Sequence, residues 1–277
     1  MTTIPMPKDC HCKTDSIRVV VFCGGPVLQS DVKQFIYRLE EHLEIEFLAA
    51  ICQSSGQSLR SIWRDFWRRR RLLAVPLAIT ELGKAIGSFL IHPIAAAELN
   101  RKVRDLSDRI HFVPDIHSPD VLQRVRSLAP DLGLIYGSPI LKPALFEIPV
   151  LGTLGIHHGK APEYRGKKTT FWEIYNGEKT AAVTIQKVNA GLDTGDILKQ
   201  GAVTTDHRSY RGVCKELEEL GIALYLQAII EVKRGTATYS PQVGNKRKLC
   251  RDPKFADMVR FTCRQLQRRF NGKNSNP

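Results

Sequence analysis

Two histidines and an aspartate are the residues of this sequence best suited to moving protons. His157 and His158 end an apolar run that begins at residue 151, and Asp193 lies between Gly191 and Gly195 further along the chain. Histidine exchanges a proton near neutral pH, and a nearby carboxylate can orient its ring or take up a proton. The two stretches therefore predict a site of acid–base chemistry, provided that the fold brings them together.

The segments around these residues alternate between strand and helix patterns. A β-branched run at 17–25 ends in Gly-Gly, a helical pattern starts at Asp31, and a second strand-like run follows at 45–52. This strand–helix–strand order is typical of a parallel sheet. Open sheets of this kind place their chemistry at the carboxyl ends of the strands, which is where His157 is expected to lie.

The same pattern continues to the end of the chain. The strands expected at 180–188 and 196–205 can pair as an antiparallel hairpin, and the loop between them holds Asp193. The other predicted elements are strands at 110–116, 132–141 and 151–158, a helix that starts at Ser118-Pro119, a helical turn at 143–148, and helices at 169–175, 209–235 and 254–270.

Residues 55–105 interrupt this order with a predicted amphipathic helical hairpin rich in Trp and Arg. Glu81 and Lys84 divide its apolar stretch and leave fewer than the ~20 residues that a membrane-spanning helix needs. The protein is therefore not expected to be transmembrane. A packed insertion, contact with an anionic membrane surface and contact with nucleic acid are all compatible with the pattern.

Positive charge is concentrated in two segments of the chain, which has 277 residues and a formal net charge of +13. Residues 60–71 contain six arginines and one aspartate, and residues 236–277 contain ten lysines or arginines and two aspartates, so these segments account for the whole excess. Arg60–Arg71 and the basic tail would suit an anionic partner such as tRNA or a membrane surface. Solvated surfaces that only aid solubility are the alternative.

The seven cysteines follow no disulfide framework. Cys23 and Cys52 end apolar runs, and we expect them to be reduced, buried thiols. The protein is then expected to be cytoplasmic, either free in the cytoplasm or peripheral to a membrane. The Cys10-His11-Cys12 trio could ligate a metal, but no second pair follows at zinc spacing, so no metal is expected.

Residues 110–200 resemble the catalytic core of the folate-dependent formyltransferases, a family that includes methionyl-tRNA, glycinamide ribonucleotide and amino-sugar N-formyltransferases. The family pattern is Asn-x-His, then a proline, then an aromatic or basic residue before glycine, and later a Leu-Asp-x-Gly loop. The matching segments are His157, Pro162, Tyr164-Arg165-Gly166 and Leu192-Asp193-Thr194-Gly195. The opening strand–helix–strand unit is similar in outline.

The resemblance implies an α/β, Rossmann-like formyltransferase fold, with a mostly parallel sheet flanked by helices, a helical insertion and a basic C-terminal tail. Residues 1–16, which lack the apolar run of a signal peptide, are then a flexible N-terminal leader. Residues 17–235 are the catalytic domain, with the insertion at about 55–105, and residues 236–277 are the basic extension. This extension is shorter than the β-barrel domain that methionyl-tRNA formyltransferases usually carry.

The resemblance also implies a transferase of one-carbon metabolism that moves a formyl group from 10-formyltetrahydrofolate to an amine. His157 would interact with the oxyanion or carry the proton, and Asp193 would orient the ring or relay the amine proton. The folate would be held largely by backbone groups of Ser138, Pro139, Ile140, Leu141, Gly159, Lys160, Ala161, Pro162, Asn189 and Leu192.

Gly155 departs from the family pattern, because it occupies the position of the asparagine. The asparagine amide is an oxyanion donor, and removal of such a donor lowers the rate by about 10²–10³-fold in a well-studied protease. His158 is a candidate replacement in this oxyanion region, and so is a water molecule. Gly159-Lys160-Ala161 also differs from the usual Ser-Leu-Leu.

Several functions fit this sequence. The acceptor of a formyltransferase would be methionyl-tRNA, which suits the basic segments, or an amino sugar or another small amine. A protein with the same fold and weakened activity could instead bind a membrane or nucleic acid. Hydrolysis of formyl-folate, with water as the acceptor, is the third hypothesis. The sequence indicates no oligomeric state.

Overall fold

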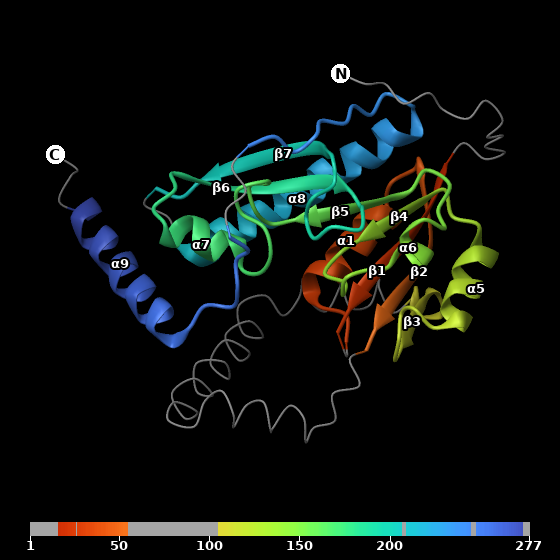
Figure 1. Ribbon diagram of the computed structural model, residues 1–277, viewed down its shortest axis with the longest axis horizontal. Coiled ribbons are helices and arrows are strands. Elements are labelled where there is room, and N and C mark those ends of the chain that lie inside the picture. Colours follow the sequence, from red (N-terminus) through yellow and green to blue (C-terminus); the bar gives the residue numbers. More distant parts are fainter. Residues whose placement is uncertain (1–15, 26, 55–104, 207–208, 245–247, 274–277) are drawn as a thin grey trace.

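The computed structural model describes residues 16–25, 27–54, 105–206, 209–244 and 248–273 (Figure 1). The Cys10-His11-Cys12 trio and the Trp- and Arg-rich segment at 60–71 lie outside these residues. The predicted leader and insertion do so as well, apart from their last residues, and therefore stay predictions. Among the helices of the described residues, none is long and apolar enough to cross a membrane.

A seven-stranded sheet in the order β3-β2-β1-β4-β5-β6-β7 forms the centre of the molecule. Strands β1 to β5 run parallel, whereas β6 is antiparallel to both β5 and β7. The strands are β1 (Ile17–Gly24), β2 (Ile45–Gln53), β3 (Ile110–Val113), β4 (Leu132–Ile135), β5 (Thr153–His157), β6 (Thr180–Lys187) and β7 (Ile197–Thr204). The predicted α/β class, the mostly parallel sheet and the β6–β7 hairpin are confirmed.

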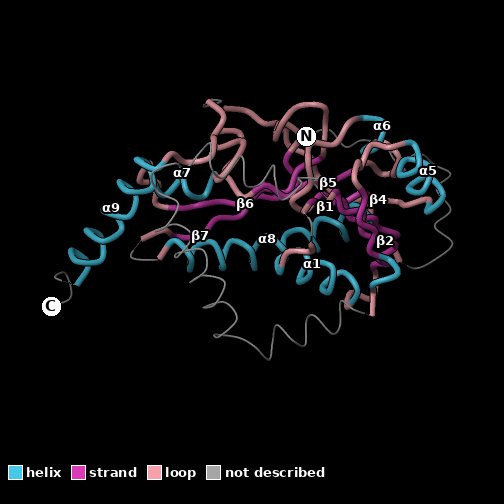
Figure 2. The backbone as a smooth tube through the Cα atoms, turned by 90° about the horizontal axis from the view of Figure 1, so that it is seen from below, coloured by secondary structure: helices cyan, strands magenta, loops and turns pink. Residues whose placement is uncertain are grey.

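Helices cover both faces of this sheet (Figure 2). Helices α1 (Ser30–Glu40) and α8 (Tyr210–Lys233) lie on one face and share its apolar core. Helices α5 (Pro119–Leu128), α6 (Pro143–Phe146) and α7 (Thr169–Tyr175) lie on the other. Helix α5 begins at the predicted signal, because the Ser118 side chain accepts the backbone N–H of Val121 and Pro119 fills the first turn.

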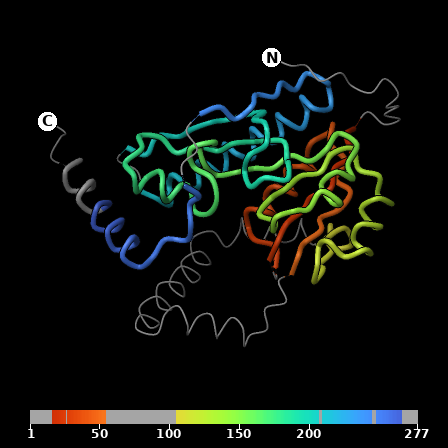
Figure 3. The backbone as a smooth tube through the Cα atoms, in the orientation of Figure 1, coloured from red at the N-terminus to blue at the C-terminus, as the bar shows by residue number. Residues whose placement is uncertain are grey.

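The chain after α8 returns across the domain past β7 and ends in α9 (Phe255–Lys273) (Figure 3). Ser240 pairs with Ile197 at the start of β7, and Cys250 pairs with Gly166 in the loop before α7. Phe261 of α9 then packs on Phe171 of α7, with ring centroids 4.6 Å apart. The extension expected from residue 236 onward is therefore packed against the domain along much of its described length.

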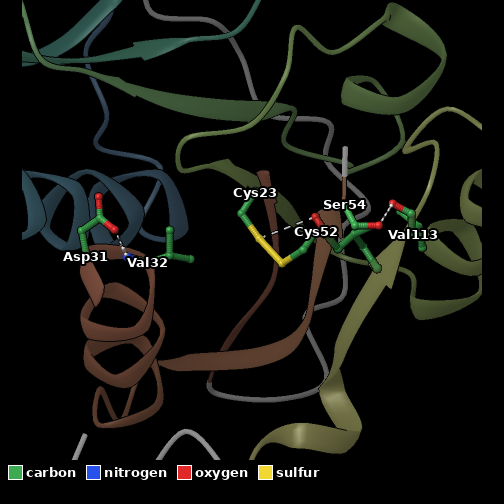
Figure 4. Close-up of a disulfide and its surroundings, with 7 residues drawn as sticks. Cys23, Asp31, Val32, Cys52, Ser54 and Val113 are labelled. Carbon is green, nitrogen blue, oxygen red and sulfur yellow. Dashed lines mark hydrogen bonds between the residues drawn. A yellow bond between two sulfur atoms is a disulfide. The ribbon is translucent and has the colours of Figure 1, made fainter. Parts of the chain in front are cut away.

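The expectation of reduced thiols is wrong for two of the cysteines. Cys23 on β1 and Cys52 on β2 form a disulfide (Figure 4). They are register partners of adjacent parallel strands, and their Cα atoms lie 4.6 Å apart, within the range that a disulfide spans. Sequence spacing could not reveal this, because only the strand register places the two residues side by side.

Tyr225 of α8 joins β4 to β5 from the middle of the sheet. Its fully buried hydroxyl accepts the N–H of Ile135 at 3.0 Å and donates to the carbonyl of Leu154 at 2.7 Å. The pair Ile135–Gly155 is the last one in the register of β4 and β5. The hydroxyl thus satisfies backbone groups where the two strands separate, and burial raises the pKa of Tyr225 well above its usual value.

Tyr225→Phe should destabilise the fold, because it leaves the N–H of Ile135 and the carbonyl of Leu154 without this partner in the core. A buried unpaired polar group costs about 1–3 kcal/mol, so the free energy of unfolding in urea should fall by about that amount. Tyr239→Phe is the control, since the Tyr239 hydroxyl makes no hydrogen bond within the described part of the chain. Equal unfolding free energies for the two variants would contradict this role of Tyr225.

Candidate active site

His157 is the last residue of β5, and its ring is held in one orientation. The Nε2 atom lies 2.7 Å from the carbonyl oxygen of Tyr164. A carbonyl only accepts hydrogen bonds, so Nε2 must carry the donated proton. The other nitrogen, Nδ1, then faces Asp193 Oδ2 at 3.6 Å, and only 8% of the His157 side chain is exposed. Nδ1 is therefore the nitrogen that is free to gain and lose a proton.

Asp193 reaches this ring from the loop between β6 and β7. Its backbone has a positive φ of 50°, a conformation that aspartate tolerates better than most residues. Oδ2 accepts the N–H of Gly166 at 3.0 Å, and Oδ1 lies 3.5 Å from the side-chain nitrogen of Gln186. The fold thus brings together the histidine and the aspartate that the sequence proposed as a pair.

Gln242, which was not predicted from the sequence as a site residue, holds the loop that contains Asp193 through its side-chain amide. Its Nε2 lies 3.1 Å from the carbonyl oxygen of Asp193, 2.8 Å from that of Gly195 and 2.9 Å from Gln186 Oε1. Gln242 comes from the segment after α8, about fifty residues away along the chain. A lone glutamine in a basic, polar tail gives no local signal of this role.

Gly159 makes room for the ring of His157. A Cβ atom at this position would lie 2.6 Å from His157 Nε2 and 2.8 Å from the Thr169 side chain. Real Cβ atoms do not approach other atoms so closely, so only glycine fits without a shift. The departure from the usual serine at this position therefore has a steric reason here.

Lys160, Ala161 and Pro162 form the rest of this loop and also lie outside the cavity described next. The N–H of Lys160 donates to the buried carboxyl of Glu173 at 2.8 Å, and the carbonyl of Ala161 accepts from Gln200 at 3.2 Å. Burial raises the pKa of Glu173 to about 7. The proposed folate contacts of the 159–162 loop stay a prediction.

A small cavity of about 130 Å³ opens beside Gly155 and Asp193. It adjoins a groove of about 500 Å³, and the two share Lys187, Val188 and Asn189 in their walls. Some of the residues that were predicted from the sequence to contact folate line the small cavity. They are Ser138, Pro139, Ile140, Leu141, Asn189 and Leu192.

Gly155 leaves unused space in the wall of this cavity. A Cβ atom there would meet Val188 at 3.4 Å and Ile135 at 3.9 Å, which are ordinary contact distances. The backbone of β5 can therefore accept a side chain at this position. Sterics at the Cβ position therefore do not require glycine at 155.

A second cavity, of about 470 Å³, lies beside the ring of His157. His157 and His158 line it together with Asp31 at the start of α1 and Glu218 of α8. Gly155 and His158, which the sequence grouped as one oxyanion region, therefore line different cavities. Nothing in the sequence marks Glu218 as a site residue, because it lies in an ordinary amphipathic helix.

The described residues contain no group of three or more His, Cys, Asp or Glu side chains arranged to hold a metal ion.

Comparisons with known proteins agree with this geometry. Residues 95–229 match the family model described as formyl transferase. Methionyl-tRNA formyltransferase of Ruminiclostridium cellulolyticum is 35% identical over 130 residues, which are 46% of this chain and 41% of that protein. The chain thus matches less than half the length of this relative.

Solved structures share the fold at low sequence identity. Phosphoribosylglycinamide formyltransferase from Bacillus halodurans superposes with a TM-score of 0.54 at 17% identity, over 78% of this chain and 94% of that one. A sugar N-formyltransferase from a Shewanella species gives a TM-score of 0.54 at 13% identity, over 88% and 86% of the two chains. Residues 95–229 therefore match the formyl transferase family model, and the chain shares the fold of solved formyltransferases.

Proposed function

We propose that this protein transfers a formyl group from 10-formyltetrahydrofolate to an amine. The observation that carries the proposal is that the His157–Asp193 pair joins two cavities. Asp193 lines the small cavity and His157 lines the larger one, yet their side chains lie 3.6 Å apart. A transfer between two substrates needs two binding spaces that meet at the groups that move protons.

The small cavity and its groove suit the folate. The 130 Å³ cavity has room for only part of that molecule, and the groove of about 500 Å³ that shares its wall can take the remainder. The formyl carbon would then lie beside Gly155 and the Asp193 loop. Backbone groups of Ser138–Leu141 and Asn189 would contact the donor, as in the expectation from the sequence.

In this arrangement His157 Nδ1 handles the proton. The amine attacks the formyl carbon and the carbonyl oxygen becomes an oxyanion, after which the bond from carbon to the folate N10 breaks. N10 gains a proton as the amine nitrogen loses one. Protonation of His157 at Nδ1 produces an imidazolium beside the carboxylate of Asp193, and that contact stabilises the charge. The Tyr164 carbonyl keeps the Nε2 proton in place throughout.

The acceptor is a primary amine in each of the candidates that the relatives suggest. The relatives are named for methionyl-tRNA, phosphoribosylglycinamide and sugar acceptors. The cavity of about 470 Å³ has the volume of a small-molecule site and could also take the aminoacyl end of a larger molecule. Attraction of a tRNA or a membrane by Arg60–Arg71 and the tail stays a prediction.

The proposal is tested by offering the protein 10-formyltetrahydrofolate with methionyl-tRNA, amino sugars and glycinamide ribonucleotide. Mass spectrometry of each acceptor identifies the species that gains a formyl group. Formate release without added amine would indicate hydrolysis instead. Binding of neither the donor nor any amine would favour a protein that has kept only the fold.

His157→Ala should lower the rate of formyl transfer by about 10²–10⁴-fold, because it removes the proton-handling nitrogen. Turnover of the folate, followed by absorbance, measures the effect. His111→Ala, which changes a histidine of the edge strand β3, is the matched control and should retain activity. Unchanged turnover in the His157 variant would overturn the catalytic assignment.

Gly155→Asn should retain activity or raise it, because it restores an amide donor in space that the wall already provides. A gain of up to about 10²-fold is the expected scale for one oxyanion donor. Gly155→Ala adds the Cβ atom without the amide and serves as the control. If Asn and Ala give the same rate, the amide does not contact the oxyanion.

Gln242→Leu should lower kcat by about 10–10²-fold. Loss of its hydrogen bonds releases the Asp193 loop, and displacement of a catalytic group by about 1 Å has a cost of this order. Gln123→Leu, at an exposed position of α5, is the control. A normal kcat for Gln242→Leu would show that the tail does not position Asp193.

A further inference from the structure

Glu218 and His158 form a half-buried pair that the proposed transfer does not yet use. His158 Nε2 lies 3.0 Å from Glu218 Oε2, but the two atoms lack the alignment of a hydrogen bond. Glu218 Oε1 is buried and has no hydrogen-bond partner among the described residues either. Buried polar atoms without partners are costly, so a pair left in this state in the wall of a cavity points to a missing polar group.

The backbone of α8 is shaped to bring Glu218 close to His158. Gly221 lies one helical turn after Glu218, and a Cβ atom there would lie 2.8 Å from Ile156 and 3.7 Å from His158 Nε2. The helix therefore approaches β5 more closely than a larger residue would permit. Glycine in a helix interior costs about 1 kcal/mol relative to alanine, so this approach is retained against a local preference.

The environment of the pair disfavours the charged form of each group. Burial lowers the pKa of His158 to about 4, with the neighbouring His157 acting in the same direction. Burial raises the pKa of Glu218 to about 7, and Asp31 at the start of α1 adds to this rise.

Besides His157, the other titratable groups of the cavity wall are Tyr136 after β4, Lys168 before α7, and Tyr210 and Cys214, which lie on α8 with Glu218. Burial raises the pKa values of both Tyr210 and Cys214, so neither adds negative charge near neutral pH. The negative charge available to a ligand in this wall is therefore that of Asp31 and Glu218.

We propose that Glu218 binds the ammonium group of the acceptor and takes one proton from it, with His158 positioning the Glu218 carboxylate. This inference rests on the proposed formyl transfer and names the form in which the acceptor binds, a primary ammonium. A primary amine is largely protonated at neutral pH and cannot attack carbon until it loses that proton. A carboxylate in the wall that also contains His157 supplies both attraction and a base.

The proton balance is complete. An N–H bond of the ammonium breaks and the Glu218 carboxylate becomes a carboxylic acid, which leaves a neutral amine with its lone pair. That nitrogen forms the bond to the formyl carbon, as described above, and the His157–Asp193 pair handles the second proton. Glu218 then returns its proton to solvent, so the net reaction releases one proton for each ammonium consumed.

The first test compares Glu218→Gln with Glu219→Gln, the adjacent exposed glutamate of the same helix. With glucosamine as the amine and saturating 10-formyltetrahydrofolate, Glu218→Gln should lower kcat/KM for the amine by about 10²-fold or more. In the parent, kcat/KM should rise with pH as Glu218 ionises, with a midpoint near pH 7. The variant should lose this dependence, and Glu219→Gln should keep it.

His158→Gln separates a positioning role from a structural one. It should shift the midpoint of the same pH profile while its folate dissociation constant stays within about twofold of the parent value. A profile identical to that of the parent would overturn the role of His158. A Glu218→Gln protein that transfers formyl as well as the parent would overturn the role of Glu218.

A second measurement does not depend on turnover. Infrared difference spectra of the carboxyl band, assigned to Glu218 by its absence in Glu218→Gln, should show a lower titration midpoint in the presence of glucosamine. An unchanged midpoint would overturn the proposal. Failure of the proposed function itself is distinct, since the parent would then neither bind 10-formyltetrahydrofolate nor formylate any amine.

Discussion

The hydroxyl of Tyr225 fixes the geometry on which the rest of the molecule depends. Parallel strands β4 and β5 must separate for cavities to form at their carboxyl ends, and separation exposes backbone groups that cannot reach water. Tyr225 supplies one oxygen that serves both strands, and Phe35 and Tyr136 continue a stack of rings from it. Helices α1 and α8, which line the larger cavity, are thereby fixed relative to β5.

The position of the His157 ring results from contacts that are distant in sequence. The Tyr164 carbonyl determines which nitrogen carries the fixed proton, and Asp193 stands at the other nitrogen. Gly166 and Gln242 hold the aspartate loop, and Cys250 in turn pairs with Gly166. The segment after α8 is therefore part of the frame of the site, although its composition resembles that of a solvated tail.

The sequence allowed prediction of those features that depend on local residue patterns. Hydrophobic periodicity gave the order of strands and helices, and the motif spacing gave His157 and Asp193 as a pair. The Cys23–Cys52 disulfide, the roles of Glu218 and Gln242 and the steric need for Gly159 could not be predicted. Each depends on strand register or on the approach of segments that are far apart in the chain. The division of Gly155 and His158 between two cavities could not be predicted either, because it depends on where helices α1 and α8 and the loop before β7 lie relative to β5.

Two sets of charged groups act on an approaching acceptor in this protein. The net positive charge acts over a long range, whereas the carboxyl groups of the cavity wall act at contact distance and carry the opposite sign. The excess of +13 comes from segments remote in sequence from the motifs, and a field of this kind attracts anionic molecules over distances set by the ionic strength. The wall around His158 instead contributes the carboxyl groups of Asp31 and Glu218, which act over contact distances in a partly buried space. An acceptor that satisfies both would carry its negative charge away from its reacting amine. Aminoacyl-tRNA and nucleotide-linked amino sugars both have this arrangement, so in the proposed transfer the long-range charge and the cavity wall would favour the same separation of charges in the acceptor.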